Sequence, residues 1–320
     1  MVASPALQRG VGATNNTSGV PEGRRPLPLP HPTVILERKA PQPHTPPCPH
    51  AKKPTPALPL LPYDETMPIP ERLNPAFASA TAAIPIDETR KRLIVALDVP
   101  DAPAAAALVA RLEDTCAWFK VGLELFTSAG PAVLEPILAR GHSVFLDLKF
   151  HDIPNTVAGA VRSAAALGVH MLTVHAAGGP AMLAAAREAL EGLSHPPQLL
   201  AVTVLTSIDA AQLEAIGLPR EPESQVELLA RMGLAEGISG FVCSPREVAA
   251  LRELTGPAGV LVIPGIRPAG AGSGDQKRIA TPAQALRQGA SYLVVGRPIT
   301  QAPNPAVAAE AILKEMSEAL

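Results

Sequence analysis

The sequence has few cysteines. Only Cys48, Cys116 and Cys243 occur in 320 residues. An odd number of widely separated thiols excludes a framework of disulfides. This cysteine usage is typical of a reducing compartment, and we expect a cytoplasmic protein.

Long apolar runs and a surplus of charge are also lacking. No stretch approaches the roughly 20 apolar residues that a membrane span requires, and the first residues lack the apolar core of a secretory signal. The formal net charge of −2 leaves no basic excess to neutralise phosphates, which argues against a general nucleic-acid binder. We therefore expect a soluble protein that binds neither membranes nor nucleic acid.

Proline, in contrast, is abundant, and its distribution divides the chain. Of the 37 prolines, 19 lie in the first 90 residues, where they remove backbone donors and disfavour long helices. No helical or strand periodicity is visible there. We predict a disordered, polyproline-like extension over residues 1–88 and a catalytic domain over residues 89–320.

Three other interpretations of the extension stay open. It could bind a proline-recognition module, or its His44, Cys48 and His50 could bind a metal, although no fourth ligand with regular spacing is present. The natural start could also be Met67, with the preceding residues arising from an over-extended reading frame.

From Lys91 onward, short apolar runs alternate with alanine- and leucine-rich amphipathic stretches. Eight strand–helix units in about 230 residues suit a single (β/α)₈ TIM barrel better than an open doubly wound sheet, which would also alternate. The predicted strands are Leu93–Val99, Trp118–Leu125, Ser143–Phe150, Met171–Ala176, Leu199–Thr206, Gly240–Ser244, Val260–Ile266 and Tyr292–Arg297. The clearest predicted helices are Ala104–Glu113, Val157–Leu167, Pro245–Leu254 and Ala306–Met316.

The most informative stretch is Asp147–Asp152, which reads Asp-Leu-Lys-Phe-His-Asp after an apolar run. Strand side chains alternate between faces, so Asp147 and Lys149 should point the same way. Burying an acid and an amine together is costly unless they are paired or used in chemistry. The spacing predicts a charge cluster at the C-terminal end of the third strand, where barrel enzymes hold their catalytic groups.

The polar residues at the strand ends each have a purely structural interpretation as well. Asp152 could cap the following helix, His175 is more simply a hydrogen-bonded core histidine, and Arg297 could be a solvated rim residue. For Lys120 and Lys149 a structural role is less satisfactory, because both interrupt otherwise apolar strands.

Two segments near the C-terminus suggest a phosphate site. Gly296 and Arg297 follow the eighth strand, where many barrels bind phosphate through backbone N–H groups, and arginine adds a bidentate donor. The glycine-rich segment 269–276 follows the seventh strand and resembles a mobile lid, with Gln276 able to reach a phosphate or base.

Taken together, these motifs resemble the bacterial orotidine 5′-phosphate decarboxylase family over roughly Leu93 to Ile299. The third-strand run Phe145–Thr156 is the most specific. The other matching motifs are Ala96–Asp98, Phe119–Gly122, Val202–Ser207, Pro264–Arg267, Asp275-Gln276 and Val295–Arg297. The proline-rich first 90 residues have no counterpart in the family.

The resemblance implies decarboxylation of orotidine 5′-monophosphate (OMP) to uridine 5′-monophosphate (UMP) in pyrimidine biosynthesis, with no metal or organic cofactor. It also implies a homodimer with shared active sites. By this resemblance Asp98 binds the ribose, Lys120 links the ribose to the charged cluster, and Thr206 reads the pyrimidine. The residues around the reacting carbon would be Asp147, Lys149 and Asp152, with Asp152 and Thr156 supplied by the neighbouring subunit. Those that hold the phosphate would be Arg267, Gln276, Gly296 and Arg297.

The implied chemistry suits these residue types. Loss of CO₂ leaves an sp² carbanion that the ring π-system does not delocalise, so stabilisation must come from charge placed beforehand. We expect Lys149 to supply that charge and the replacing proton, because flanking carboxylates favour its charged form.

Two rival interpretations remain. Sugar-phosphate enzymes such as 3-keto-gulonate-6-phosphate decarboxylase and hexulose-phosphate synthase share an Asp-x-Lys-x-x-Asp signature. They resemble metal enzymes with a glutamate ligand where this chain has Lys120, which would repel Mg²⁺. A catalytically silent barrel that only binds nucleotides or a partner would not need the charged cluster.

Overall fold

Eight strands form a closed barrel in the part of the chain that the structure describes. The computed structural model describes residues 85–218, 220–268 and 278–319. Each strand pairs with the next along the chain, and the last returns to the first. The strands are β1 (Leu93–Ala96), β2 (Trp118–Gly122), β3 (Ser143–Phe150), β4 (Met171–His175), β5 (Gln198–Val202), β6 (Gly240–Val242), β7 (Val260–Ile263) and β8 (Tyr292–Val295).

Closure depends on β1, which pairs with a strand on each side. Val95 lies opposite Phe119 of β2 and opposite Val295 of β8. All the pairs are parallel, so the C-terminal ends of the strands meet at one rim of the barrel. The prediction of a (β/α)₈ barrel is confirmed, and the alternative of an open doubly wound sheet is wrong.

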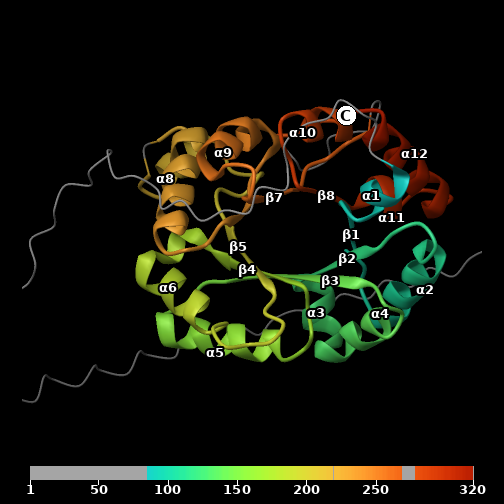
Figure 1. Cartoon of the computed structure of the whole chain (residues 1–320), viewed down its shortest axis with the longest axis horizontal. Coiled ribbons are helices and arrows are strands. Elements are labelled where there is room, and N and C mark those ends of the chain that lie inside the picture. Colours follow the sequence, from blue (N-terminus) through green and yellow to red (C-terminus); the bar gives the residue numbers. More distant parts are fainter. Residues whose placement is uncertain (1–84, 219, 269–277, 320) are drawn as a thin grey trace, which may run out of the picture. The chain divides into compact units, whose positions relative to one another are not determined.

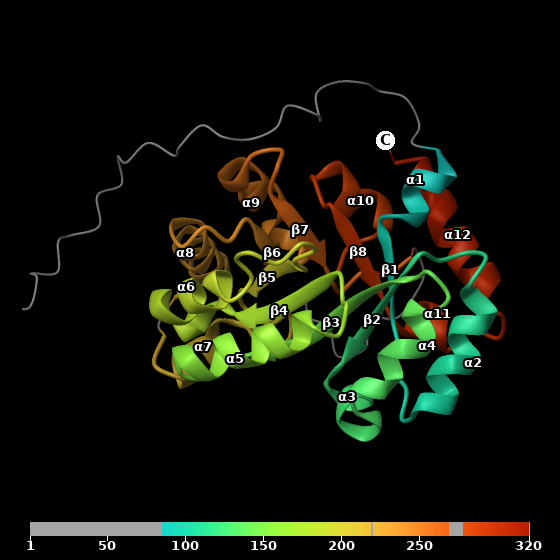
Figure 2. The same ribbon diagram turned by 60° about the horizontal axis from the view of Figure 1, so that its bottom comes forward.

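Helices surround the strands, as Figure 1 shows from one end of the barrel and Figure 2 shows from the side. The described α-helices are α1 (Ile86–Arg90), α2 (Ala102–Leu112), α3 (Leu123–Ala129), α4 (Glu135–Leu138), α5 (Pro154–Ala165), α6 (Pro180–Glu188), α7 (Ala210–Ala215), α8 (Pro222–Ala235), α9 (Val248–Thr255), α10 (Pro282–Arg287), α11 (Arg297–Thr300) and α12 (Pro305–Ser317). Short 3₁₀ helices are η1 (Pro131–Leu134), η2 (Ala176–Gly178) and η3 (Pro245–Glu247).

Two layers of buried side chains explain why the strands read as nearly continuous apolar runs. Along β1, Ile94 and Ala96 belong to a small cluster inside the barrel, whereas Leu93 and Val95 belong to the large cluster between strands and helices. Both faces of each strand are therefore covered, as is usual for parallel sheets. The other members of the inner cluster are Phe145, Met171, Leu200, Val262 and Val294.

The strands start at or within one residue of their predicted positions, but most of them end earlier. β3 has the predicted bounds, whereas β1 ends at Ala96 instead of Val99 and β8 ends at Val295 instead of Arg297. The ladders stop there because the chain leaves for its helix, and a residue without a partner strand cannot continue the hydrogen bonding. Asp98 and Thr206 consequently lie in the segments that follow β1 and β5, whereas the charged residues predicted on the second and third strands remain within β2 and β3.

Helix α1 crosses the predicted boundary between extension and barrel at residue 88. It packs against α12, so the last residues assigned to the extension contact the barrel's final helix. Residues 1–84 lie outside the described part of the chain, and the rest of the domain division stays a prediction.

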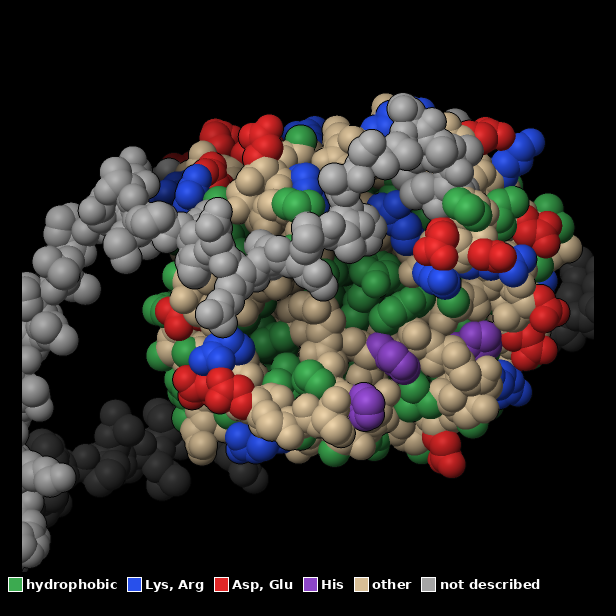
Figure 3. Space-filling model, viewed as in Figure 1, with side chains coloured by type: hydrophobic (Ala, Val, Ile, Leu, Met, Phe, Trp, Pro, Cys, Tyr) green, Lys and Arg blue, Asp and Glu red, His purple; other side chains and the backbone are tan. Residues whose placement is uncertain are grey.

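Within the described ranges, no helix combines the length and apolarity needed to cross a membrane. Figure 3 shows one face of the molecule, on which acidic and basic side chains are interspersed around the edge and hydrophobic and uncharged ones lie nearer the centre. The signs of charge are mixed on this face, as the net charge of −2 suggests.

Candidate functional site

An irregularity in β3 brings its two charged residues together. The pairing of β3 with β4 shifts register between Leu146 and Phe150. Lys149 has a φ of 50° and is the only described non-glycine residue with positive φ. Such a conformation costs on the order of 1–3 kcal/mol and persists only where the surroundings enforce it. Strained residues of this kind occur preferentially at functional sites, so Lys149 is marked out by its backbone as well as its charge.

A buried threonine on β4 fixes the strained backbone of Lys149. The Lys149 backbone N–H donates to Thr173 Oγ1 at 2.9 Å, and the Thr173 hydroxyl donates to Asp147 Oδ1 at 3.1 Å. Thr173 is fully buried. Thr173 is not among the predicted site residues, although it interrupts the otherwise apolar run 171–174 of β4.

Two carboxylates and two ammonium groups alternate along the inside of the rim formed by the C-terminal ends of the strands. Lys149 Nζ lies 2.8 Å from Asp147 Oδ1, Lys120 Nζ lies 3.7 Å from Asp147 Oδ2, and Lys120 Nζ lies 3.0 Å from Asp98 Oδ1. We call Asp98, Lys120, Asp147 and Lys149 the charged row. The prediction that Asp147 and Lys149 point the same way is confirmed, and Lys120 joins them as expected from its position on β2.

Burial changes along the charged row. The side chains of Lys120 and Asp147 are 11% and 13% exposed, that of Lys149 is 28% exposed, and that of Asp98 is 56% exposed. The centre of the row is therefore shielded from solvent, and charge–charge interactions there are screened less than at its ends.

Gly122 leaves the space that the end of Lys120 occupies, whereas Gly296 lies at an ordinary contact distance from Asp98. A Cβ on Gly122 would lie 2.8 Å from Lys120 Nζ, and a Cβ on Gly296 would lie 3.6 Å from Asp98 Oδ2. Gly122 ends β2 and Gly296 follows β8, so the chain passes close to the row on both sides. Gly296, which the sequence predicts to bind phosphate, lies beside Asp98 in the structure.

Asp152 and Thr156 lie on the surface near this rim. Both are exposed. Asp152 Oδ1 accepts a hydrogen bond from the Ile153 backbone N–H at 2.7 Å, and no ion pair joins it to Lys149 among the described residues. Helix α5 is capped by Ile153 without a side-chain hydrogen bond. The helix-cap interpretation of Asp152 is therefore wrong.

His175 lies at the end of β4, half-buried beside the charged row. Its Nδ1 accepts from the Ala177 backbone N–H at 3.3 Å, and its ring stacks on His151 with centroids 5.3 Å apart. Burial lowers the pKa of His175, and the nearby His151 and Lys149 lower it further. The expected hydrogen bond is present, but His175 lies at the rim, where the charge of Lys149 affects its pKa.

The predicted phosphate and base residues follow β5, β7 and β8 at the same rim. Arg267 is buried and its Nη1 donates to the Ile266 carbonyl at 2.8 Å. Thr206 is half-buried, and Arg297 is exposed, in keeping with a rim position. Gln276 and the predicted lid 269–276 lie outside the described residues. Within those residues, no group of three or more His, Cys, Asp or Glu side chains is placed to hold a metal ion.

Comparison with known proteins agrees with this arrangement. Residues 91–312 match the family described as orotidine 5′-phosphate decarboxylase / HUMPS. The chain belongs to this family. It is similar to the orotidine 5′-phosphate decarboxylases of Moorella thermoacetica, at 56% identity over 233 residues, and of Halorhodospira halophila, at 56% identity over 228 residues. These alignments cover 71% of this chain and 92% and 97% of the relatives.

A solved structure supports the same conclusion. The crystal structure of orotidine 5′-phosphate decarboxylase from Lactobacillus acidophilus is similar, with a TM-score of 0.63 and 41% identity, covering 70% of this chain and 98% of that one. The resemblance to this family is confirmed. Membership makes the chain an enzyme of the carboxy-lyase type.

Proposed function

We propose that this protein decarboxylates OMP to UMP and CO₂ in pyrimidine biosynthesis, without a metal or organic cofactor. The observation that carries the proposal is the alternating charged row at the C-terminal rim of the barrel. Successive aspartate and lysine side chains in the row are 2.8 to 3.7 Å apart. The names of the relatives support the choice of substrate.

In this mechanism Lys149 stabilises the carbanion at C6 of the pyrimidine and then protonates it. The bond between C6 of the pyrimidine and its carboxylate carbon breaks, CO₂ leaves, and the electron pair stays on C6. An ammonium already fixed by Asp147 stabilises that charge without reorganisation. Lys149 Nζ then transfers its proton to C6, and the resulting amine regains a proton from solvent.

The neighbouring residues orient the substrate. Asp147 lies beside the departing carboxylate, where like-charge repulsion disfavours the ground state. Asp98 binds the ribose, and Lys120 joins it to Asp147. Thr206 reads the pyrimidine, whereas Arg267, Gln276, Gly296 and Arg297 hold the phosphate, whose binding energy supports orientation at the distant carbon.

The direct test uses the protein after treatment with a chelator. We expect OMP to be converted to UMP, and the change in pyrimidine absorbance measures this conversion. No conversion would overturn the proposal. Turnover of a sugar phosphate that requires Mg²⁺ would instead favour the rival sugar-phosphate activity, although Lys120 occupies the position where that rival needs a metal ligand.

We also propose that the protein is a homodimer in which Asp152 and Thr156 complete the partner's site. Both residues are exposed next to the rim, and Ile153 between them is 68% exposed. Mixing inactive Lys149→Ala and Asp152→Ala chains should restore activity, because hybrid dimers contain one intact site. With random exchange of subunits about one quarter of wild-type activity is expected. No recovery after demonstrated exchange would contradict sharing.

The division into extension and barrel also stays a proposal. The family match begins at residue 91, which supports a catalytic domain that starts near residue 89. Deletion of residues 1–66 should leave kcat and KM unchanged, and a loss of activity would assign the extension a part in folding or in the site. A cytoplasmic location belongs to the same proposal.

A further inference from the structure

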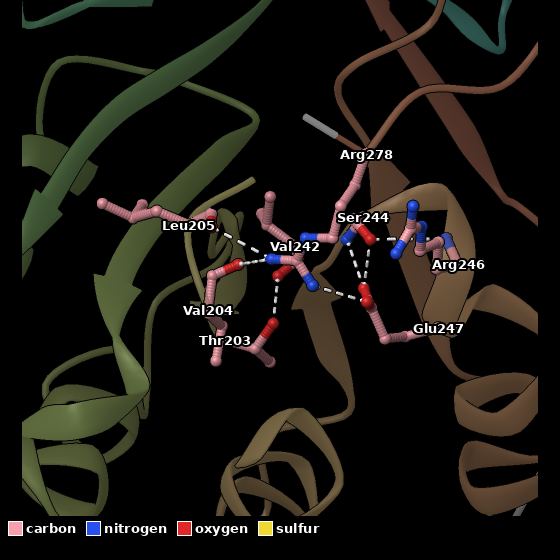
Figure 4. A network of polar contacts seen from close by, with 8 residues as sticks. All are labelled: Thr203, Val204, Leu205, Val242, Ser244, Arg246, Glu247 and Arg278. Atoms are coloured by element: carbon pink, nitrogen blue, oxygen red, sulfur yellow. Dashed lines mark hydrogen bonds and ion pairs between the residues drawn. The ribbon is translucent and has the colours of Figure 1, made fainter. Parts of the chain in front are cut away.

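A second charged cluster lies at the same rim, apart from the charged row, and is almost completely buried. It consists of Ser244, Glu247 and Arg278, which are 0%, 2% and 4% exposed. Glu247 Oε1 lies 2.5 Å from Arg278 Nη1, and Glu247 Oε2 accepts from the Ser244 backbone N–H at 2.9 Å and from the Ser244 hydroxyl. Figure 4 shows the three residues around this ion pair.

The other side of the Arg278 guanidinium holds the segment that follows β5. Its Nη2 donates to the carbonyls of Val204 at 3.1 Å and Leu205 at 3.0 Å (Figure 4). The Leu205 carbonyl also accepts from the Ile208 backbone N–H at 2.9 Å, which closes the turn that contains Thr206. Arg278 thus fixes the backbone directly before the proposed pyrimidine-reading residue.

The chain around Arg278 is tied equally closely to the proposed phosphate side. Two residues later, Ala280 forms a parallel bridge with Ile266, and its carbonyl accepts from the Arg267 backbone N–H at 2.9 Å. Arg267 is one of the proposed phosphate-binding residues. The Arg278–Glu247 pair therefore lies where the base-reading and phosphate-binding segments meet.

Stability alone does not account for such a pair. Desolvation of two buried charges offsets most of their mutual attraction, and apolar residues of similar volume would fill the space as well. An apolar side chain could not, however, fix two carbonyl oxygens and one carboxylate in a set geometry. The planar guanidinium does this through separate N–H groups.

We propose that Arg278 and Glu247 are positioning residues that set the distance between Thr206 and Arg267, so that one nucleotide spans both. The inference rests on the proposed function, because it takes the two ends of the ligand to be a pyrimidine and a 5′-phosphate. The pair does not touch the substrate. It acts by holding the segments that do.

The test compares a whole nucleotide with its phosphate-bearing fragment. Arg278→Lys keeps the charge opposite Glu247, but a compact ammonium cannot reach the carboxylate and both carbonyls together. We expect kcat/KM for OMP to fall by about 100-fold through misplacement of the ligand, and affinity for UMP to fall by roughly tenfold on the same grounds. Affinity for ribose 5-phosphate, which engages one side only, should stay within about twofold.

Arg252 provides a matched control at the opposite end of the barrel. Its guanidinium also clamps backbone carbonyls, those of Gly256, Gly259 and Gly289, but these lie before β7 and β8. Arg252→Lys should lower the melting temperature while leaving kcat/KM and the preference for UMP over ribose 5-phosphate unchanged.

A second variant, Arg278→Met with Glu247→Gln, removes both charges and should show the same selective loss as Arg278→Lys.

The inference would be overturned if the folded variants kept kcat/KM within about threefold of wild type, since misplacement should cost far more. It would also be overturned if ribose 5-phosphate affinity fell as much as UMP affinity, or if neither variant folded, because the role would then be structural. Failure of the proposed function would be seen in the wild-type protein, which would not turn over OMP, whereas failure of this inference is seen only in the variants.

Discussion

At the scale of single residues, Lys149 combines a charge, a strained backbone and two close partners. Replacing it with alanine should lower kcat on the order of 10⁴-fold or more, because both charge stabilisation and proton delivery are lost. UMP should still bind, as measured by calorimetry. Lys314→Ala, at an exposed position on α12, is the control and should behave as wild type. Substantial turnover by Lys149→Ala would show that Lys149 is not the proton donor.

Thr173 tests whether the strain at Lys149 matters. Valine at this position keeps the shape but removes the hydroxyl that accepts from Lys149 and donates to Asp147. We expect kcat/KM to fall by about tenfold, the usual consequence of losing a hydrogen bond to a charged group. Thr255→Val removes another buried hydroxyl, on α9, and should affect only the melting temperature. Equal kinetics in the two variants would argue against a positioning role for Thr173.

At the scale of secondary-structure elements, the end of β2 must be glycine for the charged row to form. An alanine Cβ at Gly122 would meet the flexible end of Lys120, so the lysine should move away from Asp98 at little cost in stability. We expect kcat/KM to fall by about tenfold while the melting temperature changes little. Gly233→Ala should do the opposite, because its Cβ would lie 2.7 Å from the Phe241 ring in the packed core. A large loss of stability in Gly122→Ala would contradict this explanation.

Elements also show which local features the sequence predicted. The strands were found because their apolar runs are covered on both faces, and β3 was found with both its bounds. The ends of the other strands were placed too late, since apolar residues continue into the loops after the ladder stops. The register shift in β3 left no signal, because a single amino-acid sequence does not reveal where a bulge will relieve or impose strain.

At the scale of the whole molecule, burial of histidines should make stability depend on pH. Burial lowers the pKa of His142, His170 and His175 below the ordinary value of 6.5. Between their lowered values and 6.5 the unfolded chain binds more protons than the folded one, so stability falls as the pH decreases from about 6.5. Thermal unfolding at pH 8 and at successively lower pH would show this.

One histidine allows the origin of that pH dependence to be checked. His142 is buried against the Phe119 ring, with centroids 5.0 Å apart. His142→Leu removes one of the titrating groups, so the decrease in melting temperature below pH 6.5 should become smaller. An unchanged slope would show that other groups are responsible.

The sequence alone determined the barrel and most of the candidate site. Periodicity gave eight strands, and charges inside apolar strands gave Lys120, Asp147 and Lys149, because charge is too costly to bury without a partner. Only the tertiary structure showed Thr173 beneath Lys149, Gly296 beside Asp98, and the Arg278–Glu247 pair that joins the segments after β5, β6 and β7. These contacts link residues far apart in the chain, and their partners are chosen by barrel closure and strand register, which no local pattern of residues encodes.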